Sequence, residues 1–174
     1  AASIGYVDYN GLLVKFQRRF ANNFSFRNAY TWGKAIDINS DNDGDVSFTN
    51  VYDIENYHRG PADYDVTHTL SSSWIYELPI AREQWYGGWQ VNGILSLMSG
   101  QPFSILVDGD NAFVGGFTAQ RANRLGNGNL PRDQRTPERW FDTSAFATPK
   151  AGTFGNSGRN IIDGPGTNLY DFSL

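Results

Sequence analysis

Apolar and polar side chains alternate along several stretches of the chain, beginning near the N-terminus. In residues 9–20 most apolar side chains share one parity, and the same holds for residues 24–36. A period of two is typical of a β-strand, because successive side chains point to opposite faces of the sheet. The short Asn-rich segment 21–23 joins the two stretches, so the pattern predicts a β-hairpin.

Three more alternating stretches follow, at residues 65–78, 89–107 and 167–174. Pro102 interrupts the second of them. Since proline cannot donate to a sheet ladder, we expect the chain to bend there and to continue on a different course. Each stretch is longer than the strands of five or six residues that a soluble sandwich uses.

Long connections separate some of these stretches. Residues 37–64 and 108–166 are predicted as long irregular loops, which are unusual in a compact soluble domain and ordinary for the outer loops of a large barrel. We therefore predict an all-β chain in which residues 1–174 form a single segment. This segment is an antiparallel meander of about five long strands with long loops on one side, a partial wall of an outer-membrane-type β-barrel.

The apolar parity of each stretch defines the side chains expected to face lipid or a neighbouring copy. Many are aromatic and lie near strand ends, as in the girdles of membrane barrels, although the core of a soluble sandwich would use the same pattern. The set comprises Leu12, Val14, Phe16, Phe24, Phe26, Tyr30, Trp32, Trp74, Tyr76, Trp89, Val91, Leu95, Leu97, Tyr170 and Phe172.

Composition and charge exclude several other classes of protein. The net charge of −4 gives no basic footprint for nucleic acid, and the lack of Cys excludes disulfides, thiolate metal sites and a Cys nucleophile. No apolar run is long enough for a transmembrane helix. The N-terminus lacks the features of a signal peptide, so we expect a processed product or a fragment. No G-x-S-x-G motif occurs, and we expect no enzyme activity.

Four ordered segments resemble the C-terminal β-barrel region of TonB-dependent receptors, in particular the Oar-like proteins. They are YNGLLVKFQRRFANNFSFRNAYTWGKAID, GPADYDVTHTLSSSWIYELP, GGWQVNGILSLMSGQPFSI and RWFDTSAFATPKAGTFGNSGRNIIDGPGTNLYDFSL. The resemblance implies several consecutive strands of a barrel of about 22 strands in the outer membrane of a Gram-negative-type bacterium. The family's plug domain and TonB box have no counterpart here.

About five strands cannot close a barrel, since bacterial single-chain barrels begin at eight. The two free edges are templates for pairing, either with the missing strands of a larger barrel or with other copies of the chain. The second case would give a self-assembling extracellular tube or filament. A third hypothesis is a soluble β-domain that binds calcium or glycan through its loops.

An acidic stretch after residue 36 is the one candidate for a metal site. Oxygen ligands recur at every second position, as in an EF-hand loop, but Asn50 occupies the position that needs a bidentate carboxylate. A strand also precedes the stretch where an EF-hand has a helix. We therefore expect a hydrated loop, with calcium as the alternative and no other cofactor; the candidate ligands are Asp37, Asn39, Asp41, Asp43 and Asp45.

Overall fold

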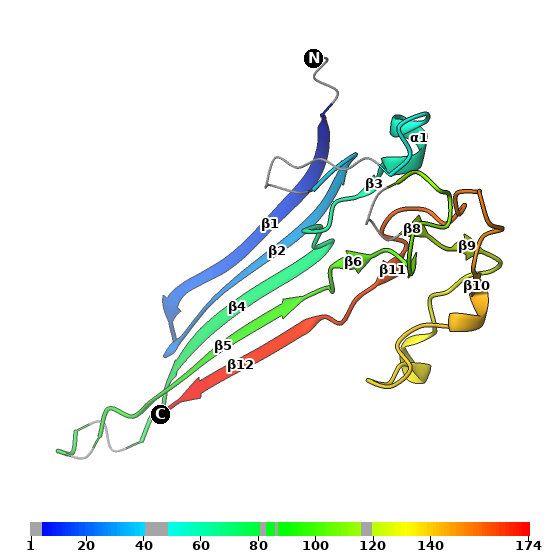
Figure 1. Ribbon diagram of the computed structural model, residues 1–174. Helices are drawn as coiled ribbons and strands as arrows, with labels where there is room; N and C mark the ends of the chain where they lie inside the picture. Colours follow the sequence, from blue (N-terminus) through cyan, green and yellow to red (C-terminus); the bar gives the residue numbers. More distant parts are fainter. Residues whose placement is uncertain (1–4, 41–48, 81–82, 86, 116–119) are drawn as a thin grey trace. The chain divides into compact units, whose positions relative to one another are not determined.

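A computed structural model describes most of the chain, namely residues 5–40, 49–80, 83–85, 87–115 and 120–174. The described residues are strands and loops with very little helix (Figure 1). Their Cα positions divide into two compact units. One unit contains residues 10–34, 66–100 and 165–174, and we call it the sheet unit. The other contains residues 1–9, 35–65 and 101–164, and we call it the loop unit.

A six-stranded sheet in the order β1-β2-β4-β5-β12, with β3 paired to β2, forms the main architecture. The pairs β2–β4, β4–β5 and β5–β12 are antiparallel. Figure 1 shows these strands side by side in chain order. The strands are β1 (Val7–Ala21), β2 (Phe24–Asp37), β3 (Gly60–Pro61), β4 (His68–Glu77), β5 (Gln90–Met98) and β12 (Thr167–Ser173). This arrangement confirms the all-β antiparallel class, and the described strands do not close into a ring.

The turn between β1 and β2 uses two residues in the left-handed region of backbone space. Asn22 and Asn23 have φ angles of 51° and 67°. Positive φ at both central positions is what a type I′ hairpin turn requires, and Asn adopts it more readily than most residues. The Asn23 carbonyl also accepts a hydrogen bond from the backbone N–H of Glu77 (2.8 Å), which ties the turn to β4.

The strand register places most of the predicted apolar side chains on one face of the sheet, which we call the apolar face. Residues directly opposite each other in neighbouring strands share a face. The rows are Trp32 with His68; Tyr30 with Leu70, Leu97 and Asn168; Asn28 with Ser72, Leu95 and Tyr170; Phe26 with Trp74, Gly93 and Phe172; and Phe24 with Tyr76 and Val91.

The alternate residues form the opposite side of the sheet, which we call the polar face. Most of them are small or polar, with a few aliphatic side chains among them. The rows are Thr31, Thr69, Met98 and Thr167; Ala29, Ser71, Ser96 and Leu169; Arg27, Ser73, Ile94 and Asp171; Ser25, Ile75, Asn92 and Ser173; and Glu77 with Gln90. Across β2, β4, β5 and β12 the sheet therefore places most apolar side chains on one face and most polar side chains on the other.

The loop unit has its own small core and several short elements. Its two-stranded pairs are β6 with β11, β7 with β8, and β9 with β10. The elements are α1 (Ile54–His58), β6 (Pro102–Phe103), β7 (Leu106–Val107), β8 (Gln120–Arg121), β9 (Asn123–Arg124), η1 (Arg132–Gln134), η2 (Thr143–Ala145), β10 (Phe146–Ala147) and β11 (Ile162–Asp163). Its buried apolar side chains are Ala35, Ile38, Ala62, Ala122, Leu130, Ala145 and Ile162.

The loop unit is also where the structure departs from the sequence predictions. The segments 37–64 and 108–166, predicted to be irregular, contain these short strands and helices. The strand predicted for residues 89–107 ends at Met98, and Pro102 begins the separate strand β6, whose partner is β11. The Cα positions also divide into two compact units, and the organisation of residues 1–174 as a single barrel segment stays a prediction.

The start of the strand predicted for residues 65–78 differs for a local reason. Asp65 is buried, and its carboxylate accepts a hydrogen bond from the backbone N–H of Ala35 (2.8 Å). The Asp65 N–H donates to the Ala62 carbonyl, which makes a turn. These bonds hold Asp65 in a turn, and β4 begins three residues later, at His68.

Candidate functional site

Aromatic side chains concentrate on the apolar face near the β1–β2 turn. The ring centroids of Phe16 and Phe26 are 5.3 Å apart, those of Phe24 and Phe26 5.6 Å, and those of Phe24 and Tyr76 6.3 Å. Such separations are in the range where aromatic pairs attract each other. The Phe16–Phe26 contact places Phe16 of β1 on the same side as the apolar face of β2.

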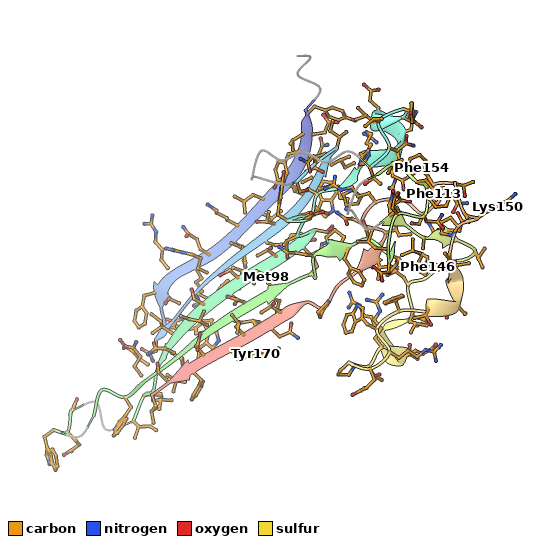
Figure 2. The ribbon with its side chains drawn as sticks, in the orientation of Figure 1. Met98, Phe113, Phe146, Lys150, Phe154 and Tyr170 are labelled. Atoms are coloured by element: carbon orange, nitrogen blue, oxygen red, sulfur yellow. The ribbon has the colours of Figure 1, made fainter. Side chains whose placement is uncertain are left out.

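This apolar face is exposed on the outer strands β1 and β12, and most of its side chains on β2, β4 and β5 are half-buried. Phe16, Tyr170 and Phe172 are 66%, 73% and 71% exposed. Figure 2 shows the Tyr170 side chain on the outer strand β12. The face runs from Phe24 to Trp32 along β2, which is about 27 Å at about 3.4 Å per residue. Strands tilted by about 45° would reduce this to about 19 Å of height, close to the apolar band of about 25 Å on membrane barrels.

The end of the apolar face far from the turn carries a polar contact. The hydroxyl of Tyr30 and Nδ1 of His68 are 2.7 Å apart, and their rings are stacked with centroids 6.1 Å apart. Trp32 is the cross-strand partner of His68. Amphipathic aromatic side chains therefore lie at both ends of the face, with Leu70, Leu95 and Leu97 between them.

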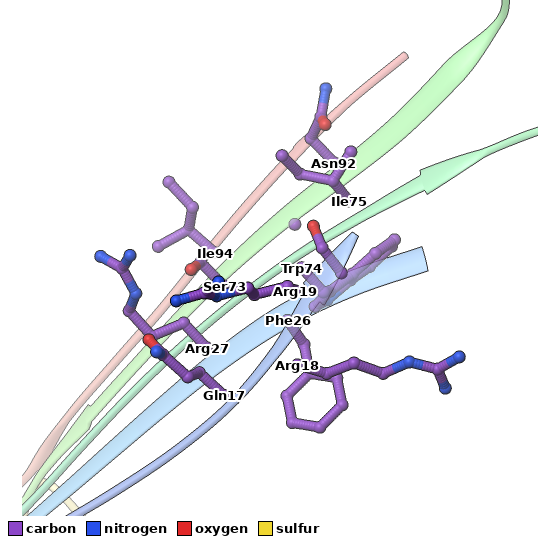
Figure 3. A pocket seen from close by; sticks show the side chains of 12 residues that line it. Gln17, Arg18, Arg19, Phe26, Arg27, Ser73, Trp74, Ile75, Asn92 and Ile94 are labelled. Atoms are coloured by element: carbon purple, nitrogen blue, oxygen red, sulfur yellow. The ribbon is translucent and has the colours of Figure 1, made fainter. Parts of the chain in front are cut away.

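A hollow of about 630 Å³ lies in the sheet unit, and most of its lining comes from the polar face. Figure 3 shows the side chains of Gln17, Arg19 and Arg27 extending to the same side of the sheet, where Ser73 also lies. Arg18 and Phe26 extend to the other side in the same view. The hollow therefore brings two guanidinium groups together beside neutral hydrogen-bonding groups.

Two of the three arginines that line this hollow have no ion-pair or hydrogen-bond partner in the described part of the chain, whereas the third, Arg18, donates to the Ala21 carbonyl (3.4 Å). Neither Arg19 nor Arg27 makes an ion pair or a hydrogen bond there. Asp171 lies in the same row as Arg27, but three strands away, which is about 14 Å at about 4.8 Å per strand. That separation exceeds the Debye length of about 8 Å at physiological salt, so Asp171 does little to balance these charges.

A buried ion-pair network holds the loop unit together. Arg159 binds the carboxylate of Asp37, which is fully buried, and also pairs with Asp63 (3.1 Å). Its guanidinium donates to the hydroxyl of Ser40 (2.7 Å), which in turn donates to Asp37 (2.7 Å). Breaking a buried pair is strongly destabilising because it leaves an uncompensated charge, so this network is structural.

A second hollow, of about 480 Å³, lies next to this network in the loop unit. Arg121 lines it, is 8% exposed, donates to the Tyr57 carbonyl and stacks on the Tyr57 ring with 3.6 Å from Cζ to the centroid. His58 also lines it. Burial, followed by the positive charges of Arg121 and Arg159, lowers the pKa of His58 to about 4, so this imidazole is neutral at pH 7.

The structure describes only part of the calcium candidate. Asp41, Asp43 and Asp45 lie outside the described residues. Asp37 is held by Arg159 and Ser40, so its carboxylate serves an ion pair in this structure. Among the described residues, no group of three or more His, Cys, Asp or Glu side chains is placed to hold a metal ion.

The structure places most, but not all, of the predicted apolar side chains on one face of the sheet. Twelve residues of the predicted apolar set, those on β2, β4, β5 and β12 together with Phe16, share the apolar face. Leu12 and Val14 are exposed on β1, and Trp89 precedes β5, where its carbonyl accepts from the Leu78 N–H (2.9 Å). That Arg19 and Arg27 line the same hollow was not predicted, although each has the polar parity of its strand.

Comparison with known proteins gives one match. The family model for the outer membrane beta barrel domain matches residues 1–174. No curated protein and no solved structure has significant similarity to the chain. No helix in the described part of the chain is long and apolar enough to cross a membrane. The match extends over the whole length, and the chain therefore belongs to the outer membrane beta barrel domain family and is an outer-membrane protein.

Proposed function

We propose that the chain is a non-catalytic wall segment of a transporter barrel of the TonB-dependent, Oar-like type. Its apolar face contacts lipid and its polar face lines the interior. The observation that carries the proposal is the separation of side chains by polarity, which the register maintains across β2, β4, β5 and β12. A water-filled or plugged barrel needs this alternation of apolar-out and polar-in residues.

The exposure of the apolar face supports contact with lipid. Soluble monomers rarely expose large contiguous apolar patches, and such patches mark membrane or protein interaction sites. Arg18 carries the parity of Val14 and Phe16, and its guanidinium is 3.4 Å from the Ala21 carbonyl beside the turn. A long side chain in that position reaches the membrane surface while its stem stays in the apolar layer.

Site-directed spin labelling tests which face contacts lipid. The chain contains no Cys, so single Cys variants place one label at a chosen position. We expect labels at Phe26→Cys and Leu95→Cys, in a membrane, to be accessible to oxygen and protected from a water-soluble nickel reagent. Labels at the polar-face neighbours Ser73→Cys and Ser96→Cys should show the reverse. The absence of this alternation would overturn the proposal.

A second candidate function rests on the free edges of the sheet. β1 and β12 are at opposite ends of the strand order, and each has one neighbour in it. An unpaired edge of 15 residues, such as that of β1, is a strong template for another strand. Head-to-tail pairing of copies through β1 and β12 would give rings or filaments.

Electron microscopy of the purified chain separates the two candidates. Filaments that persist without detergent support assembly between copies through the strand edges. Isolated pores that require detergent support the wall of a membrane barrel. Pro substitutions at Tyr170 and Phe172 of β12 should abolish filaments, because proline removes N–H donors from the edge.

A further inference from the structure

We propose that the hollow on the polar face binds an oxyanion, the carboxylate or phosphate group of a small solute, between Arg19 and Arg27. The site is lined by both arginines together with Gln17, Ser25, Ser73 and Asn92. That the anion is a solute inside a barrel rests on the proposed function. The binding site itself rests only on the geometry of the sheet unit.

The first argument is the placement of the two guanidinium groups. Arg19 belongs to β1 and Arg27 to β2, so each comes from a different strand of the hairpin. Both line the same hollow and extend to the same side of the sheet (Figure 3). A guanidinium has five donors in a planar fork that matches a carboxylate or phosphate, and two forks facing one space can hold two edges of the same anion.

The second argument is the lack of a counter-charge. The chain as a whole is acidic, with a net charge of −4. Within the sheet unit, however, residues 10–34 of the β1–β2 hairpin carry Arg19, Arg27 and Lys15 on the polar parity and no carboxylate there. None of the three has an ion pair in the described part of the chain. Like charges in one hollow repel each other, and a bound anion removes this repulsion.

The third argument is the neutral lining. Ser73 is the cross-strand partner of Arg27, so the two side chains lie in the same row of the polar face, and both line the hollow. Gln17 lines the same hollow, and Figure 3 shows its side chain extending to the same side of the sheet as Arg19 and Arg27. Hydroxyl and amide donors complete the coordination of an oxyanion, as in other sites that combine arginine with neutral donors.

Calorimetric titration of the full chain in detergent micelles tests the site, with citrate and pyrophosphate as probes at fixed ionic strength. We expect saturable binding that Arg19→Gln and Arg27→Gln each weaken by at least tenfold. The control is Arg132→Gln, which removes the same charge from an exposed position of η1 in the loop unit. It should change the affinity by less than twofold.

Two further variants test whether weaker binding results from loss of structure. Arg19→Lys keeps the charge, and its affinity for the probes should be within about fivefold of that of the unmodified chain. Ser73→Ala should weaken binding at least threefold without altering the strand signal in circular dichroism. Loss of binding equal in Arg132→Gln and Arg19→Gln, or no saturable binding, would overturn the site. Binding of an oligo-aspartate peptide without binding of citrate would overturn the small-solute assignment.

These outcomes are distinct from those that test the proposed function. If spin labels show no lipid-facing alternation but citrate binding depends on Arg19 and Arg27, the oxyanion site stands and the barrel-wall function fails. If the alternation is present but citrate does not bind, the wall function stands and the site fails.

Discussion

The indole of Trp74 on β4 lies across Gly93, its cross-strand partner on β5, and reaches Phe172 on β12. A Cβ at residue 93 would lie 2.6 Å from the indole Nε1, too close for any side chain without displacement of the ring. The centroids of Trp74 and Phe172 are 6.2 Å apart. One glycine therefore allows an aromatic side chain to cover a neighbouring strand and to contact the strand beyond it, as aromatic rescue of glycine does in other sheets.

We expect Gly93→Ala to lower the free energy of unfolding by about 1–3 kcal/mol, because overpacking forces the indole out of its position. Chemical unfolding in detergent measures the change. Gly5→Ala is the control, since a Cβ at residue 5 meets nothing within 4 Å. In a Trp74→Ala background the effect of Gly93→Ala should largely vanish. An undiminished effect in that background would contradict the contact.

Removal of the buried cation should destabilise the loop unit. Arg159→Ala leaves the Asp37 carboxylate buried without its partner, and we expect a loss of about 3–5 kcal/mol in the free energy of unfolding. Hydrogen exchange of the amides in residues 35–40 and 60–65 measures local opening. Arg132→Ala, at an exposed position of η1, should leave exchange unchanged. Equal protection in Arg159→Ala and the unmodified chain would refute the role of the network.

Acid should weaken the loop unit through His58. Its pKa in the folded chain is about 4, below the ordinary value of 6.5, because of burial and the charges of Arg121 and Arg159. Between pH 6.5 and pH 4 the unfolded chain therefore binds more protons than the folded chain, and stability falls as the pH falls through this window. Below pH 4 this contribution levels off.

Unfolding measured at several pH values checks the role of His58. We expect His58→Gln to flatten the dependence of stability on pH between 6.5 and 4. His68→Gln, which alters the other histidine of the chain, should keep the slope. A slope that survives in His58→Gln would show that another group is responsible.

The β1–β2 turn should tolerate glycine better than alanine. Asn22 has a φ of 51°, and a left-handed conformation costs an ordinary residue about 1–2 kcal/mol. Asn22→Ala should therefore lower the unfolding free energy by about 1 kcal/mol, and Asn22→Gly should leave it nearly unchanged. Thermal or denaturant unfolding of the two variants measures the difference, and equal stability would contradict the turn geometry.

The sequence by itself determined where the long strands lie and which side chains share a face of each strand. A period of two fixes which side chains share a face of a strand, so the parity of Phe24, Phe26 and Tyr30 was enough to group them. The Asn-rich turn between β1 and β2 and the bend before Pro102 also follow from local chemistry. These features depend on residues that are close together in the sequence, so they can be predicted without knowledge of the fold.

Only the tertiary structure decided which strands meet in which register and what the loop segments form. The contact of Trp74 with Gly93 and Phe172 joins three strands, and the pair of Arg159 with Asp37 joins residues 122 positions apart. Short strands such as β6 and β11 have two residues each and too little pattern to be recognised. Their stability comes from long-range packing and buried ion pairs, which the local alternation of side chains does not encode.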